Sequence, residues 1–141
     1  MTANRAALDA LCRQYNLQIL YAFGSRGKQA YYWLAESGTT LPPGASDLDI
    51  GVKPAAPLSV RQKVELAVAL EDLFGVNRVD LIVLPEADPF LAANVIRGER
   101  LFADDAYLAD EYDLYVLRRA GDLAFLERER QELILQVRNG E

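Results

Sequence analysis

Two periodicities divide the chain into strands and helices. Apolar residues run together or alternate with polar ones over residues 17–23, 46–52 and 78–84, which predicts three strands. Apolar residues recur every three or four positions over residues 1–15, 60–74 and 86–97, which predicts amphipathic helices. Strands and helices that alternate in this way favour an α/β (α+β) fold with a small mixed sheet flanked by helices.

The chain changes character beyond residue 105. Residues 107–119 and 122–138 have helical periodicity and meet at Ala120-Gly121, so the sequence predicts a C-terminal pair of helices. We therefore expect one domain at residues 1–105 and a helical extension at 106–141 packed on it. The second helix has apolar residues along one side, namely Leu123, Leu126, Leu133 and Val137. The pair is either a cap on the domain or a face for a partner or a second copy.

Composition and charge narrow the range of functions. Of 141 residues, 51% are hydrophobic and 26% are charged, which suits a soluble domain with a sizeable core. The formal net charge is -6, which argues against a nucleic-acid partner because such proteins usually present a basic face. The sequence contains no histidine, so histidine-assisted hydrolysis and histidine zinc sites are excluded. Carboxylates are then the remaining acid–base groups near neutral pH.

The N-terminal segment and the single cysteine indicate where the protein works. Cys12 is the only cysteine and lies among apolar residues at helical spacing, so we interpret it as a buried structural thiol in a reducing compartment. The first 15 residues have the pattern of an amphipathic helix and lack the apolar core of a signal peptide. No apolar run approaches the roughly 18 residues of a membrane span. We expect a cytoplasmic protein.

Three carboxylates are the candidate catalytic and metal-binding groups. Asp47 and Asp49 share one face of the strand at residues 46–52, because successive side chains point to opposite faces. Asp80 interrupts an apolar strand that should be buried, where an unpaired carboxylate is costly. A shared divalent cation would relieve the repulsion among them, although a lone Asp-x-Asp is more often a solvated strand edge. The strand-helix-strand order of residues 46–84 would lay Asp80 beside Asp49.

A Gly-Ser turn follows the first predicted strand. Gly24 and Ser25 would present backbone N–H groups to phosphate, and a helix at residues 28–36 would follow them. Arg26 and Lys28 would neutralise phosphate charge or remain solvated surface cations. The segment at residues 28–44 has the composition of a flap that would cover the phosphate-binding pocket beside this turn. It carries three aromatic residues that either stack on a base or pack in the core: Tyr31, Tyr32 and Trp33.

Taken in order, Gly24-Ser25, Asp47-x-Asp49 and Asp80 resemble the motifs of the DNA polymerase beta nucleotidyltransferase superfamily, in its minimal bacterial form, the MNT domain. The resemblance covers about residues 15 to 103 and includes a closing run at residues 96–102. One departure is the long segment at residues 28–44, which leaves the second glycine of the family open between Gly27 and Gly44.

The resemblance implies a set of site residues and ligands. The expected catalytic residues and ligands of two Mg²⁺ ions, with Mn²⁺ as the alternative metal, are Asp47, Asp49 and Asp80. The expected nucleotide-binding residues are Gly24, Ser25 and Arg26, together with Asp47 and Asp49. ATP is the implied substrate and AMP the transferred group. MNT proteins commonly act as antitoxins beside a HEPN-domain toxin, so a toxin is the expected partner, and a homodimer is also open.

Three functions remain open at this stage. The chain is an enzyme that adenylylates a protein hydroxyl, a non-catalytic module that occludes a toxin, or a nucleotidyltransferase for small molecules of the aminoglycoside type. The last is disfavoured because about 36 residues after Asp105 leave little room for a drug-binding domain.

Overall fold

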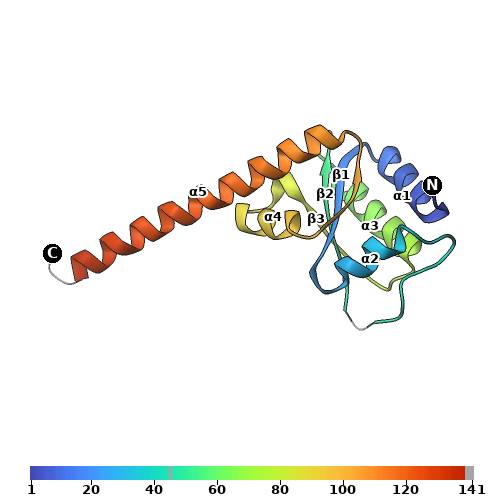
Figure 1. Ribbon diagram of the computed structural model, residues 1–141, viewed down its shortest axis with the longest axis horizontal. Helices are drawn as coiled ribbons and strands as arrows, with labels where there is room; N and C mark the ends of the chain where they lie inside the picture. The colour runs from blue at the N-terminus through green and yellow to red at the C-terminus, as the bar shows by residue number, and fades with distance from the viewer. Residues whose placement is uncertain (45, 139–141) are drawn as a thin grey trace.

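The computed structural model in Figure 1 describes residues 1–44 and 46–138. Its centre is a four-stranded sheet in the order β3-β2-β1-β4. The strands are β1 at Leu17–Phe23, β2 at Leu48–Pro54, β3 at Val79–Val83 and β4 at Glu99–Ala103. β2 and β3 are parallel, whereas β1 is antiparallel to both β2 and β4. The predicted mixed sheet flanked by helices is confirmed.

The described residues also form five α-helices and two short 3₁₀ turns around this sheet. They are α1 at Ala3–Gln14, η1 at Gly24–Arg26, α2 at Gly27–Trp33, α3 at Val60–Phe74, η2 at Leu84–Glu86, α4 at Pro89–Ile96 and α5 at Ala106–Arg138. α3 begins at a capping box in which Ser59 and Gln62 each bond the backbone N–H of the other. α4 begins at Asp88, whose side chain accepts from the N–H groups of Phe90 and Leu91.

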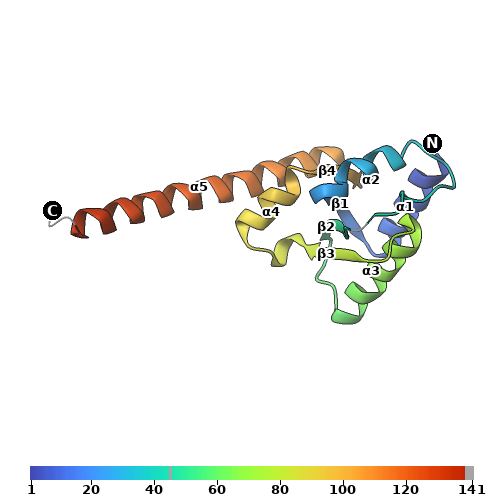
Figure 2. The ribbon, with the colours of Figure 1, turned by 90° about the horizontal axis from the view of Figure 1, so that it is seen from below.

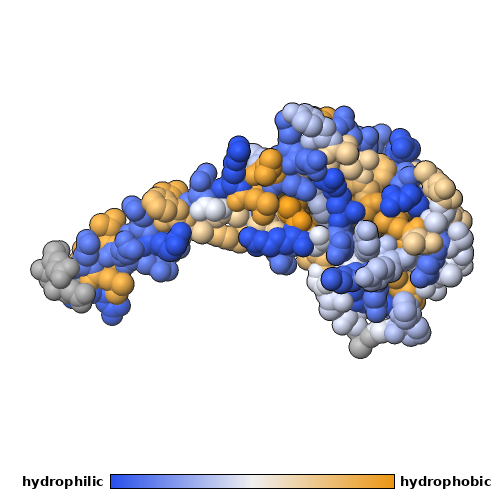
Figure 3. Space-filling view, viewed as in Figure 1, coloured by the Kyte–Doolittle hydropathy of each residue, from blue (hydrophilic) through white to orange (hydrophobic). Residues whose placement is uncertain are grey.

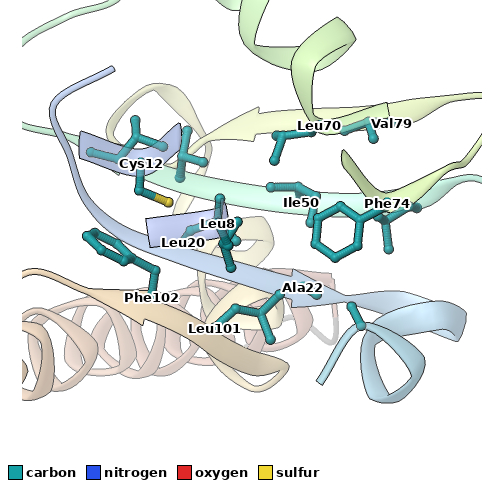
Figure 4. Packing of buried hydrophobic residues seen from close by; sticks show 14 of the residues in the cluster. Leu8, Cys12, Leu20, Ala22, Ile50, Leu70, Phe74, Val79, Leu101 and Phe102 are labelled. Carbon is teal, nitrogen blue, oxygen red and sulfur yellow. The ribbon is translucent and has the colours of Figure 1, made fainter. Parts of the chain in front are cut away.

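One face of the sheet is covered by α1, α2 and α3 (Figures 1 and 4). Leu20 and Ala22 of β1 and Ile50 of β2 point into this core, where they meet Leu8 of α1 and Phe74 of α3. Cys12 is fully buried there, and burial raises the pKa of its thiol to about 12. The predicted structural role of this cysteine is therefore confirmed.

The other face of the sheet is covered by α4 and the first half of α5. Ala109, Val116 and Ala120 of α5 are the buried residues of that helix. The hydroxyl of Tyr21 in β1 donates to Asp113, and Arg100 of β4 also pairs with this carboxylate at 3.4 Å. These polar contacts fix the near half of α5 against the sheet.

The predicted C-terminal pair of helices is wrong, because α5 is one continuous helix of 33 residues. Gly121 lies within it, and a Cβ added there would meet no atom within 4 Å. A glycine inside a helix costs only about 1 kcal/mol relative to alanine, which weakens a helix without ending it. The division of the chain at residue 105 stays a prediction. None of the described helices, α5 included, is both long and apolar enough to cross a membrane.

The buried face of α3 also differs from the sequence pattern. That pattern favours Val64 together with Leu70 and Phe74, but Val64 is 59% exposed and Leu66 is buried instead. Valines recur at positions 60, 64 and 68 and form a second apolar stripe around the helix. Periodicity alone does not say which of two stripes faces the sheet.

Candidate active site

Two neighbouring strands place Asp49 beside Asp80. In the parallel pair of β2 and β3, Asp49 is the direct partner of Asp80. Leu48 and Ile50 are fully buried on the α3 side, so alternation turns Asp49 to the opposite face. Asp47 lies two residues before Asp49, at the same end of the sheet. The expectation that α3 lays Asp80 beside Asp49 is confirmed.

Asp80 is exposed, which corrects the reasoning that first singled it out. The sequence suggested a carboxylate in a buried strand, but β3 is an edge strand of the sheet and the Asp80 side chain reaches solvent. Its presence therefore needs no buried partner to offset a desolvation cost. An exposed carboxylate next to a partly buried one instead forms the rim of a site that a ligand can approach.

Asp49 lies between the negative charges of Asp47 and Asp80, and we call these three residues the acidic group. Burial raises the pKa of the Asp49 carboxyl above its ordinary value, and the charges of Asp80 and Asp47 raise it further. Asp47 is itself paired with Arg78, whose Nε lies 3.7 Å from the carboxylate. Over residues 1–44 and 46–138, no three or more acidic, cysteine or histidine side chains are gathered closely enough to hold a metal ion. Metal binding by the three aspartates stays a prediction.

The Gly24-Ser25 turn contacts the Asp49 carboxylate. Phe23, the last residue of β1, is the strand partner of Asp49, so the turn begins directly beside it. Gly24 has φ of +70°, and a Cβ added to it would stand 2.3 Å from Oδ2 of Asp49. Only glycine suits this backbone conformation and this close approach. The turn that the sequence assigned to phosphate and the carboxylate that it assigned to metal are therefore in contact.

Arg26 has a position that the sequence did not indicate. It is only 6% exposed, so the interpretation of a solvated surface cation is wrong for this residue. Its guanidinium donates to the carbonyl oxygens of Pro42 and Ser46 and to the side chain of Gln29. These bonds hold the segment that delivers the chain to Asp47. Binding of nucleotide by Arg26 stays a prediction, whereas Lys28 is exposed.

The segment at residues 28–44, expected to be a flap, is fastened to the body at several points. Trp33 is buried, and its indole N–H donates to the carbonyl oxygen of Thr39 at 2.9 Å. The N–H of Leu41, also buried, donates to the carbonyl oxygen of Phe74 at 2.8 Å. Trp33 is therefore a core residue, which decides between the two roles considered for it. Tyr31 and Tyr32 are 49% and 64% exposed.

A family model described as "Polymerase beta, Nucleotidyltransferase" matches residues 7–107. A search of curated protein sequences gives no significant match.

Among solved structures, the chain is similar to one in a crystal structure of a mutant toxin–antitoxin pair MntA-HpeT, with TM-score 0.64, 25% identity, and coverage of 94% of this chain and 97% of the other. A toxin–antitoxin structure with AMP-PNP gives TM-score 0.64 and 26% identity over 95% and 98% of the two chains. A tri-AMPylated Shewanella oneidensis HEPN toxin in complex with MNT antitoxin gives TM-score 0.60 and 26% identity over 95% of each chain.

Proposed function

The chain belongs to the polymerase beta nucleotidyltransferase family, and from this premise we propose that it transfers AMP from ATP to a hydroxyl group of a HEPN-type toxin, as the antitoxin of that toxin. The observation that supports this most directly is the contact between the Gly24 backbone and Asp49, whose strand partner is Asp80. A turn of backbone N–H groups and a set of carboxylates meet there, as recognition of a metal-bound triphosphate requires.

The donor set of this site fits Mg²⁺. Asp47, Asp49 and Asp80 offer only carboxylate oxygens, which hard divalent cations prefer. The pKa of Asp49 is raised first by burial and then by the charges of Asp80 and Asp47, and a cation would relieve that repulsion. The Asp47 carboxylate would exchange its exposed ion pair with Arg78 for the metal, at little cost because such pairs are weak. Bound Mg²⁺ would supply charge neutralisation of the triphosphate and of the leaving pyrophosphate.

The residues of the chain then have separate tasks in the transfer. The backbone N–H groups of Gly24 and Ser25 orient the β and γ phosphates, so that the bond from the α phosphorus to the bridging oxygen lies in line with the incoming hydroxyl. The hydroxyl oxygen bonds to the α phosphorus while that bridging bond breaks, and pyrophosphate leaves with the bonding electrons. Asp80, exposed at the rim, accepts the hydroxyl proton.

The acceptor is inferred from what the relatives bind. One similar structure contains AMP-PNP and another contains an AMPylated HEPN toxin, which supports ATP as donor and a toxin as acceptor. The net charge of -6 disfavours a nucleic-acid acceptor.

A second function is favoured by a different observation. Asp47 is paired with Arg78, and the described acidic side chains form no three-membered metal cluster. A protein that neutralises its toxin by binding alone would need no such cluster. In that case the nucleotide site is vestigial and the contact with the toxin carries the whole function.

Production of the toxin in cells together with the Asp47→Asn variant of this chain distinguishes the two functions. If transfer neutralises the toxin, Asp47→Asn still copurifies with the toxin but no longer restores growth. Full restoration of growth by Asp47→Asn would establish the binding module instead. Asp72→Asn, a change at an exposed position of α3, is the matched control and should behave as wild type.

A further inference from the structure

The far half of α5 projects away from the rest of the protein. Ala120 is the last buried residue of the helix, and the residues from 121 to 138 extend beyond the body (Figures 1 and 2). Figure 3 shows apolar patches on this projecting part. The apolar side chains of this projecting part are mostly exposed, so packing within the chain does not explain them. An isolated helix of this length is also only marginally stable in water.

A continuous stripe of side chains runs along one side of α5 from the body to the projecting end. Its members recur every three or four positions and therefore share one side of the helix. They are Leu108, Tyr112, Tyr115, Arg119, Leu123, Leu126, Arg130, Leu133 and Val137. Leu126 and Leu133 are 60% and 61% exposed. We call this set the α5 stripe.

Two cavities lie at the body end of the α5 stripe. They have volumes of about 260 and 380 Å³ and share Lys53, Tyr112 and Tyr115 among their lining residues. Lys53 Nζ lies 5.3 Å from the ring centre of Tyr112, and Arg119 Cζ lies 5.8 Å from that of Tyr115. Within residues 1–44 and 46–138, neither cation has a carboxylate partner within 4 Å. Lys53 Nζ also donates to Gln18 Oε1 at 2.5 Å, and Asp104 and Glu111 line the larger cavity beside it. The stripe therefore begins at hollows walled by aromatic rings, and Arg119 is the cation there without a hydrogen-bonded or ionic partner among the described residues.

We propose that the α5 stripe and its two cavities are the docking surface for the HEPN toxin, and that the toxin contributes apolar side chains together with a carboxylate opposite Arg119. This rests on the proposed function for the identity of the partner. Solved chains that are similar over 94% and 95% of this chain come from toxin–antitoxin structures, so the matched region includes most of α5. A carboxylate on the toxin would provide the ionic partner that Arg119 lacks among residues 1–44 and 46–138.

A second copy of the chain fits the α5 stripe less well. In an antiparallel pairing of two α5 helices that sets Leu123 against Leu126, Arg119 of one copy faces Arg130 of the other. The symmetry of the pair repeats this contact of like charges, which is unfavourable. A partner with acidic residues removes the repulsion and keeps the apolar contacts.

The test is a calorimetric titration of the full chain with a purified HEPN-type toxin. Every variant of this chain carries Asp49→Asn, so that its affinity for the toxin is measured without AMP transfer. Leu126→Glu should weaken the complex at least tenfold. Leu135→Glu is the matched control, because Leu135 is 55% exposed on the opposite side of the same helix. The affinity of this variant for the toxin should stay within twofold of that of the Asp49→Asn parent. Equal effects of the two changes would overturn the proposal.

Two further results decide the occupant and the role of charge. Arg119→Glu should weaken binding at least tenfold while the helix content by circular dichroism is unchanged, and unchanged affinity would contradict the assigned carboxylate. If sedimentation shows a dimer that Leu126→Glu converts to a monomer with toxin affinity intact, the stripe is an interface between copies and the proposal is wrong. These outcomes concern binding only, so they are distinct from failure of AMP transfer.

Discussion

The backbone of Gly24 lies against the carboxylate of Asp49, so close that a Cβ on Gly24 would stand 2.3 Å from Oδ2. This contact lies between the end of β1 and the start of β2, and it leaves no room for a side chain on residue 24. A methyl group at position 24 must therefore displace either the turn or the carboxylate.

Gly24→Ala should lower both stability and nucleotide affinity. Gly38 provides a matched control, since it has the same φ of +70° but no atom within 4 Å of an added Cβ. Gly38→Ala should cost about 1–2 kcal/mol of unfolding free energy from backbone strain alone. Gly24→Ala should cost at least as much and also weaken binding of AMP-PNP with Mg²⁺ about tenfold or more, because it moves Asp49. Unchanged affinity in both variants would refute the role of the turn.

Asp49→Asn should make the metal-free protein more stable at neutral pH. The pKa of Asp49 is raised in the folded state by burial and by the charges of Asp80 and Asp47, so the folded protein holds this proton more tightly than the unfolded chain. The stability from this proton is present at low pH and is lost as the pH rises through the raised pKa. Thermal unfolding in chelator should show a higher Tm for Asp49→Asn at pH 7 and a smaller difference near pH 4.

The exposed Asp72 supplies the control for that experiment, because Asp72→Asn removes a charge outside the acidic group. If the Tm of the wild type, of Asp49→Asn and of Asp72→Asn changed with pH in parallel, the explanation of the raised pKa of Asp49 would be contradicted. Addition of Mg²⁺ and AMP-PNP should raise the Tm of the wild type and leave that of Asp49→Asn nearly unchanged, since binding to the folded state alone stabilises it.

Gly121→Ala should strengthen α5 as a continuous helix. No atom lies within 4 Å of the added methyl group, and alanine favours a helix interior over glycine by about 0.5–1 kcal/mol. Amide hydrogen exchange over residues 121–138 should slow by a few fold. Faster exchange, or a loss of helix content, would mean that the chain uses Gly121 as the hinge that its sequence suggested.

The arrangement of the acidic group could be predicted from sequence because it depends on short-range rules. A strand-helix-strand crossover makes the next strand parallel, which sets Asp80 beside Asp49. Asp47 directly precedes β2, and the expectation that it shares a face with Asp49 stays a prediction. Gly24 could be recognised by its position after an apolar strand. None of these inferences required knowledge of distant contacts.

The features that were missed depend on tertiary packing. Arg26 follows a surface turn, and its burial comes from carbonyl groups of Pro42 and Ser46, which lie 16 and 20 residues away. Asp80 is exposed because β3 happens to be an edge strand, which the composition of the strand does not show. Leu66 replaces Val64 in the core because two apolar stripes run along α3 and only the sheet selects one of them.

The most direct test of the account is transfer of label to the toxin. Purified HEPN toxin is incubated with the protein, Mg²⁺ and ATP labelled either at the α or at the γ phosphate. If the acidic group performs nucleotidyl transfer, label from α-labelled ATP appears on the toxin and label from γ-labelled ATP does not. Asp80→Asn should reduce the rate by about 100-fold or more while the complex still forms. Neutralised toxin without α label in the wild-type reaction would contradict the account.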